Sequence, residues 1–346
     1  MILRVNMRFS ASLLAALGLL AMPIPALAGP FDGKWFADVP AQNRCNSVSS
    51  MELVVADGQI MGKIHNPANV VSVSGKVDDN GDANFVVNRP GSSQTWSGTM
   101  KFQNDRFEAT WFNGGCDRHA DGNRAPSPEQ QAAMTAERRQ HQAVYADLVR
   151  RAEAGEKIDT AKLRAEYVYA ESWDFYGGKI NGLVTEAEAA AKGKDCPAAL
   201  EKVDQVLSLD FTVILAHSIR SDCLSDSDHA RARIESNIAD ALKDSLMDSG
   251  DGDTEKTAYV VSTRHEEDYA LLDRHIQLKA RQTEVRGSDG HYYDEVQGIS
   301  IRSSYGFYGG TSASVSAKTV YFNVDSFVKG RESRRAAVMT AAATVQ

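Results

Sequence analysis

The residues best suited to chemistry lie in the stretch Ser249–Tyr269, which reads SGDGDTEKTAYVVSTRHEEDY. It is the densest set of turn-forming residues and ionisable groups in the chain. Asp251, Glu266 and Glu267 are candidates for general acid–base work, which requires one desolvated carboxyl group and one charged carboxylate. One hypothesis is therefore a hydrolase that acts on an envelope glycan or peptide through these three side chains.

The segment Ser249-Gly250-Asp251-Gly252 allows two interpretations. Two glycines can expose backbone amides that bind an anion or a sugar hydroxyl, so these four residues and Tyr269 are our candidate binding residues. Alternatively, one of the glycines adopts a left-handed conformation that ends the preceding helix, and Asp251 hydrogen-bonds the turn.

Specific motifs fail at identifiable positions in the same stretch. Glu255 stands where a dinucleotide-binding loop needs its third glycine. An EF-hand loop is excluded because the glycine at its sixth position is missing. Residues 265–269, HEEDY, approach the zinc motif HExxH, but Tyr269 replaces the second histidine. The alternative for this acidic segment is the exposed start of a short helix, which the helix dipole favours. We expect no metal and no cofactor.

Residues 1–28 are predicted to be an export signal. Two arginines precede the short apolar run SLLAALGLLA, and Ala26-Leu27-Ala28 supplies small residues for a peptidase. The run is shorter than the roughly 20 residues that span a bilayer, and no other segment is long enough to do so. We therefore expect a bacterial protein that is periplasmic or secreted and does not span the membrane after cleavage.

The formal net charge of -8 is acidic. An acidic balance argues against nucleic acid and against anionic lipid as main partners. The partner that we expect is a periplasmic protein or peptide.

Residues 31–118 are predicted to form a small all-β domain. Short alternating segments flank Asp57-Gly58 and Asn104-Asp105, and they indicate a meander of about seven strands, closed as a barrel or packed as a sandwich. The opening Phe31-Asp32-Gly33-Lys34-Trp35 resembles that of small β-domains with the pattern FDGxW in exported bacterial proteins. A domain this short favours a filled interior. The alternative is a ligand site in the barrel mouth, which would make the protein a small-ligand carrier.

Residues 119–128, HADGNRAPSP, read as a linker because glycine, proline and polar residues dominate. Residues 129–330 are predicted to be a helical domain that ends in a small α+β part with a β-sheet. Within it, apolar residues at spacings of three and four mark an antiparallel helix pair similar to a helical repeat. Residues 303–316 are expected to form a mobile loop, and residues 331–346 a frayed tail.

The chain has four cysteines, which read as two disulfides in an oxidising compartment. Cys196 precedes the first helix of the pair and Cys223 is near the end of the second, so an antiparallel hairpin brings them together. Cys45 and Cys116 lie near the two ends of the β-domain. We predict the bridges Cys196–Cys223 and Cys45–Cys116.

About residues 145–329 resemble an uncharacterised bacterial family, domain of unknown function 4919. Its pattern has an LRxxY segment, here Leu163-Arg164-Ala165-Glu166-Tyr167, then a helix pair and SGDG at 249–252. An EEY element, here 266–269 with Asp268 inserted before the tyrosine, and a closing YFN strand at 321–323 follow. The resemblance implies architecture and no activity.

Because no catalytic constellation is complete, we predict a non-catalytic exported protein whose helical domain binds a peptide or protein partner. The hydrolase and the small-ligand carrier are the alternatives.

Overall fold

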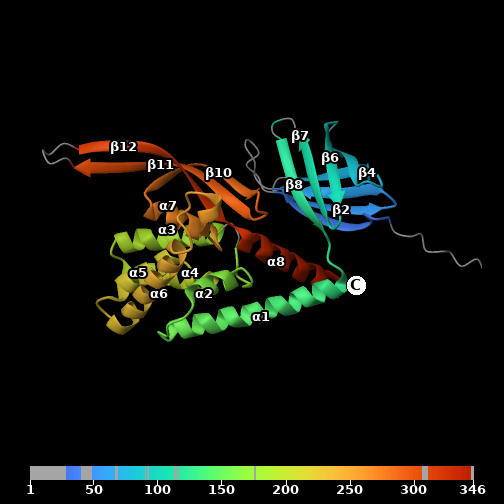
Figure 1. Cartoon of the computed structure of the whole chain (residues 1–346). Coiled ribbons are helices and arrows are strands. Elements are labelled where there is room, and N and C mark those ends of the chain that lie inside the picture. Colours follow the sequence, from blue (N-terminus) through green and yellow to red (C-terminus); the bar gives the residue numbers. More distant parts are fainter. Residues whose placement is uncertain are drawn as a thin grey trace, which may run out of the picture.

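The computed structural model describes residues 29–39, 49–66, 69–89, 91, 93–112, 115, 117–174, 177–305 and 311–343. The predicted export signal, residues 1–28, lies outside them. Figure 1 shows a β-barrel at one end, a body of helices, a small sheet, and a last helix that runs back toward the barrel. The order of elements confirms an all-β part followed by a helical part with a β-sheet. In the described residues, no helix is both long and apolar enough to cross a membrane.

The barrel consists of antiparallel strands that follow the order of the chain. Within the described residues they are β1 (Gly33–Val39), β2 (Ser49–Ala56), β3 (Gln59–His65), β4 (Val70–Val77), β5 (Asp82–Asn88), β6 (Thr95–Gln103), β7 (Arg106–Phe112) and β8 (Asp117–Arg124). Phe36 of β1 pairs with Glu52 of β2 on one side and with Asn123 of β8 on the other. The sheet is therefore a closed barrel and not a sandwich. 

Aromatic side chains fill the barrel interior. Trp35, Phe85, Phe102 and Phe107 are at most 1 % exposed, and Trp111 joins the same cluster. Trp35 meets Phe102 edge-on with ring centroids 5.0 Å apart, a favourable arrangement for aromatic pairs. The expectation of a filled interior therefore agrees with the packing.

Part of the predicted linker is wrong, because residues 119–124 belong to β8. A strand forms there despite the polar sequence because the outer edges of β1 and β7 both need a hydrogen-bonding partner. Gly122 lies against the ring of Phe107, and a Cβ atom at this position would come within 2.0 Å of it. Only residues 125–127 connect the barrel to the first helix.

Helix α1 (Pro128–Glu153) begins with a reciprocal cap at Ser127. The Ser127 hydroxyl accepts a hydrogen bond from the Gln130 amide, and the Gln130 side chain bonds back to the Ser127 amide. This reciprocal capping satisfies two amides that a helix start leaves without partners. The helices that follow are α2 (Thr160–Tyr167), α3 (Gly178–Lys192), α4 (Cys196–Leu209), α5 (Ile214–Leu224) and α6 (His229–Met247).

One predicted disulfide is confirmed. Cys196 at the start of α4 is bonded to Cys223 near the end of α5, with the Cα atoms 5.2 Å apart. Cys45 and Cys116 lie outside the described residues, so the second bridge stays a prediction.

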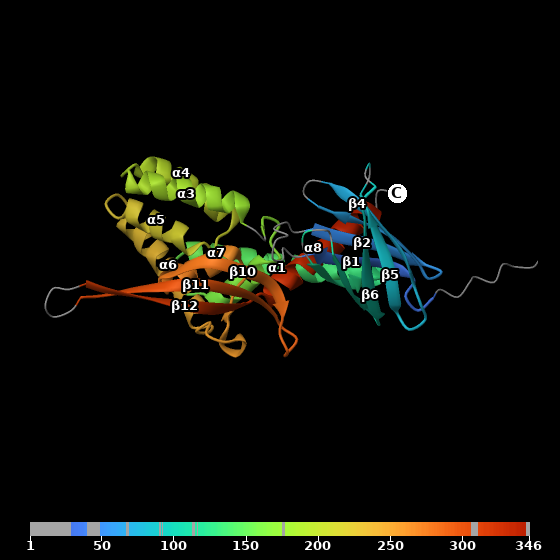
Figure 2. The same ribbon diagram turned by 90° about the horizontal axis from the view of Figure 1, so that it is seen from above.

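The C-terminal sheet has the strand order β10-β11-β12-β9. Its elements are β9 (Tyr259–Val260), α7 (Arg264–Asp273), β10 (Ile276–Arg286), β11 (Tyr292–Tyr305) and β12 (Thr311–Asn323). The sheet and the helices share one core, in which Leu242 of α6 and Val296 of β11 are fully buried. The helices and the C-terminal sheet therefore form a single domain. Figure 1 shows the helices below this sheet, and Figure 2 shows the same arrangement from above.

Two expectations about the C-terminal part are wrong. The predicted loop 303–316 contains the ends of β11 and β12, which pair from Tyr293–Asn323 to Tyr305–Thr311; residues 306–310 lie outside the described part. The predicted tail begins within helix α8 (Asp325–Ala343). This helix is held in place because Phe327 is fully buried and Arg334 donates to the carbonyl of Ala170 at 3.1 Å.

Candidate functional site

Helix α7 carries most of the candidate residues. Thr263 caps it, since its hydroxyl accepts from the Glu266 amide at 3.4 Å. Glu266 and Glu267 follow in the first turn, where the helix dipole favours negative charge. Yet they are only 2 % and 0 % exposed, so the expected exposed acidic start is wrong. Both glutamates are buried because arginines from other elements neutralise them.

Glu266 is held by Arg164 of α2. The Arg164 Nε lies 2.6 Å from Glu266 Oε1, and the Ser262 amide donates to Oε2 at 2.6 Å. Arg164 also donates to the Ser245 hydroxyl at 3.0 Å and to the carbonyl of Val260. Glu266 thus joins α2, α6 and the β9–α7 turn in a hydrogen-bonded ion pair.

Glu267 occupies a different environment, against the sheet. Arg281 Nη1 of β10 is 3.1 Å and Arg264 Nη1 is 3.6 Å from its Oε2. The charge of Asp294, in β11, also acts on Glu267. Burial, and then the charge of Asp294, raise the pKa of Glu267 well above its ordinary value.

Asp251 lies in an exposed turn. The hydrogen bond from the Thr257 hydroxyl is the main cause that lowers its pKa, and the Asp253 amide also donates to it. The amides of Asp251 and Gly252 both donate to the carbonyl of Thr257, at 2.9 and 2.7 Å. The backbone amides that a bound anion would require at these two residues are therefore already used.

The two glycines serve this turn and do not end the helix. Helix α6 ends at Met247 with Asp248 as its cap, and Gly252 has φ +69 five residues later. A Cβ atom at Gly250 would come within 2.5 Å of the carbonyl oxygens of Thr257 and Ala258. Small residues are needed here because the turn packs against the chain that enters β9.

The three candidate carboxylates consequently have separate partners. Glu266 pairs with α2, Glu267 with the sheet, and Asp251 with its own turn. Of these three, Glu266 lines the pocket described next. Ser249 accepts a hydrogen bond from the Val260 amide at 2.9 Å, so it too supports the turn.

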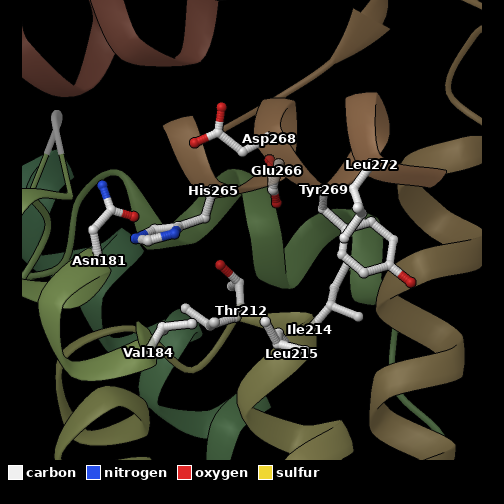
Figure 3. Close-up of a pocket in the computed structure, with 11 residues that line it drawn as sticks. Asn181, Val184, Thr212, Ile214, Leu215, His265, Glu266, Asp268, Tyr269 and Leu272 are labelled. Atoms are coloured by element: carbon white, nitrogen blue, oxygen red, sulfur yellow. The ribbon is translucent and has the colours of Figure 1, made fainter. Parts of the chain in front are cut away.

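A pocket of about 180 Å³ lies between α7 and the helices α3 and α5 (Figure 3). It is lined by Asn181, Val184, Thr212, Val213, Ile214, Leu215, His265, Glu266, Asp268, Tyr269 and Leu272. It is small compared with the roughly 300 Å³ at which sites for drug-sized molecules begin. The volume suits one side chain of a partner better than a whole metabolite.

The pocket has an apolar half and a polar half. In Figure 3 the ring of Tyr269 lies beside Leu272 and Ile214, whereas His265 extends toward Asn181. Leu272 is 67 % exposed. The apolar half therefore continues onto the surface of the molecule.

His265 is the polar group with an unmet hydrogen-bonding capacity. Its Nε2 atom is buried and has no hydrogen-bond partner in the part of the chain that the structure describes. Burial lowers the pKa of its imidazole, although Asp268, Glu266 and Asp174 oppose the shift. A neutral imidazole can donate or accept one further hydrogen bond.

A second depression of about 550 Å³ lies between the end of α1, the start of α2 and α6. Its lining includes Lys157, Ile234, Asp244 and Asp248. Among the described residues, no group of three or more His, Cys, Asp or Glu side chains could hold a metal ion.

Sequence reasoning missed two residues of the site. In the sequence Arg164 stands out only as part of LRxxY, and its role depends on a partner 102 residues away. The sequence around His265 suggests only a zinc ligand. An arginine on the inner face of a helix is a signal for a buried carboxylate partner, because buried charges are paired.

No protein-family model matches the chain, and none of the curated proteins or solved structures compared with it gives a match. The resemblance to the family of unknown function therefore stays a prediction.

Proposed function

We propose that the protein is a non-catalytic, exported interaction protein whose helical domain binds a segment of a polypeptide partner. The pocket between α3, α5 and α7 accepts one apolar side chain of that segment. The observation that carries the proposal is the pocket itself, which combines a side-chain-sized volume with an exposed apolar rim at Leu272.

The pocket matches the chemistry of a peptide. Ile214, Leu215, Tyr269 and Leu272 offer an apolar surface to an anchoring side chain. Interfaces commonly depend on a few anchors in such pockets.

The carboxylate geometry argues against the hydrolase alternative. Acid–base catalysis needs two carboxyl groups that face one substrate. Asp251, Glu266 and Glu267 have separate partners, and Arg164 and the Ser262 amide already occupy the oxygens of Glu266. The filled barrel interior argues in the same way against a small-ligand carrier that uses the β-domain.

Export is part of the proposal. The Cys196–Cys223 disulfide is compatible with an oxidising compartment, where such bonds persist.

A selection of displayed random peptides against the mature protein tests the proposal. We expect enriched peptides with an apolar anchor, whose affinity falls at least about tenfold in Leu272→Asp, since burying an unpaired charge is costly. Leu278→Asp is the matched control, because Leu278 is also exposed, at 46 %, and does not line the pocket. Failure to enrich any peptide, or equal loss in both variants, would contradict the proposal.

A further inference from the structure

Buried polar atoms without hydrogen-bond partners gather where α7 packs on the sheet. Within the described residues they include both carboxylate oxygens of Glu267, Oδ2 of Asp294 and Nε of Arg281. Glu267 is 0 % and Asp294 is 1 % exposed, so water does not reach them freely. Buried acceptors without a well-aligned hydrogen bond are costly, and such a group of them in one place requires an explanation.

Charged side chains from α7 and β10 surround the carboxyl groups of Glu267 and Asp294. Arg264 of α7 lies 3.2 Å from Asp294 Oδ2, and Arg281 of β10 lies 3.1 Å from Glu267 Oε2. Arg281 also binds the exposed Asp268 at 2.9 Å. The two arginines are therefore shared among three carboxylates.

Glu284 of β10 is the remaining acidic neighbour. Its amide donates to Asp294 Oδ1 at 2.8 Å, and its carboxylate is held by Arg331 of α8, with both contacts at 2.7 Å. Arg331 is thus committed to Glu284. With every group ionised, Glu267, Asp294 and Asp268 carry three negative charges against the two positive charges of Arg264 and Arg281.

One bound proton reduces the excess negative charge and supplies a donor between the two carboxyl groups. Arg264 contacts both of them, 3.6 Å from Glu267 Oε2 and 3.2 Å from Asp294 Oδ2, so the two carboxyl groups are neighbours. Two ionised carboxylates cannot bond, because each is only an acceptor, whereas a protonated one can donate to the other. Two carboxyl groups at one site commonly share a proton for this reason.

We propose that Glu267 and Asp294 hold one proton between them in the folded protein at neutral pH, and that this shared proton fixes α7 on the sheet. The pair is a positioning device and not a catalytic one, because both side chains are buried. It goes beyond the proposed function, since no ligand is needed for the pair to exist. The opposite face of α7 lines the pocket, so the proton also holds Tyr269 and His265 in place.

The pH dependence of this device has a definite sign. Burial raises the pKa of both carboxyl groups, Glu267 well above its ordinary value. The folded protein therefore keeps the proton at pH values where unfolded carboxyl groups, with pKa near 4, have lost theirs. The stabilisation is complete below about pH 4 and is lost as the pH rises through the raised pKa of the pair.

The direct test is infrared spectroscopy of the whole mature protein, which distinguishes a protonated carboxylic acid from a carboxylate. The spectra are recorded in an Asp210→Asn background, because burial raises the pKa of Asp210 to about 7 and its own carboxyl group would add a band. In that background we expect a carboxylic acid band at neutral pH that disappears in Glu267→Gln and in Asp294→Asn. In Glu267→Gln the amide nitrogen supplies the donor that the proton supplied, so the variant is expected to fold. Asp273→Asn, on the same helix but paired with Lys243, should keep the band. A band that persists unchanged in both variants of the pair would overturn the proposal.

Unfolding measurements between about pH 5 and about pH 9 give an independent readout. The unfolding constant of the wild type, divided by that of Glu267→Gln, should rise by up to about tenfold per pH unit until the pair loses its proton. The corresponding ratio for Asp273→Asn should stay flat. A flat ratio for Glu267→Gln as well would show that the pair holds no extra proton. Neither experiment uses a peptide, so their outcome is separate from the test of the binding function.

Discussion

Arg164 Nε lies 2.6 Å from Glu266 Oε1, and the two side chains are 5 % and 2 % exposed. The pair joins α2 to α7 across 102 residues of sequence. A buried ion pair is not by itself evidence of high stability, since its desolvation can cancel its attraction. Removing only one partner is nevertheless destabilising, because the other charge then stays buried without a counter-charge.

Replacing Arg164 with Met should therefore destabilise the helical domain strongly. We expect a loss of about 3–5 kcal/mol in the free energy of unfolding, the range found when one partner of a buried pair is removed. Urea unfolding followed by circular dichroism measures it. The double variant Arg164→Met with Glu266→Met should recover much of the loss.

The exposed pair Lys101–Asp82 is the control for this prediction. Its side chains are 51 % and 63 % exposed, so Lys101→Met should cost under about 1 kcal/mol. Similar losses in Lys101→Met and Arg164→Met would contradict the argument from burial.

Asp210 should make stability depend on pH. Burial raises its pKa to about 7, against hydrogen bonds from the amide and hydroxyl of Thr212. Since the folded pKa is raised, its stabilisation is complete below the unfolded pKa near 4 and is lost as the pH rises through about 7. The change is roughly 4 kcal/mol across this window.

Asp210→Asn tests this prediction because an amide does not titrate. The difference in unfolding free energy between wild type and Asp210→Asn should shift in favour of the variant as the pH rises from about 4 to about 7. Parallel pH profiles for the two proteins would rule out a raised pKa at this site.

Gly122→Ala should destabilise the barrel. The added Cβ atom would lie 2.0 Å from the Phe107 ring, so the β7–β8 pairing has to shift. Overpacking of this kind costs about 1–3 kcal/mol. The thermal midpoint of the barrel, followed by tryptophan fluorescence, should fall.

Gly182→Ala is the matched control. Gly182 lies within α3, and a Cβ atom there meets nothing within 4 Å. Alanine is the better helix former by about 1 kcal/mol, so this variant should be neutral or more stable. A loss as large as that of Gly122→Ala would point to backbone effects and not to contact with Phe107.

Much of the fold was predictable from local patterns. Alternation around Asp57-Gly58 predicted the β2–β3 hairpin, and both residues have the positive φ that such a turn requires. Ser127 and Pro128 are residue types typical of a helix start, and α1 begins there. The antiparallel helix pair predicted the Cys196–Cys223 bridge. Each of these depends on interactions between residues close in sequence or joined by one hairpin.

Local patterns failed where a distant partner decides the structure. Residues 119–124 look like a linker, yet they form β8 because β1 and β7 need a strand between them. Similarly, residues 331–343 look like a tail, but they continue α8, whose buried Phe327 lies just before them. In both cases tertiary contacts outweigh a weak local preference.

The sequence by itself determined the composition of the candidate site: that α7 would carry histidine, two glutamates and a tyrosine. Only the tertiary structure decided their roles. Glu266 is buried in an ion pair with Arg164, and Glu267 is buried against the sheet, where Arg281 contacts it. Helices α3 and α5 form a pocket together with His265 and Tyr269 of α7. The physical reason is that burial and charge pairing depend on which surfaces meet, and surfaces from elements far apart in sequence meet only in the folded chain.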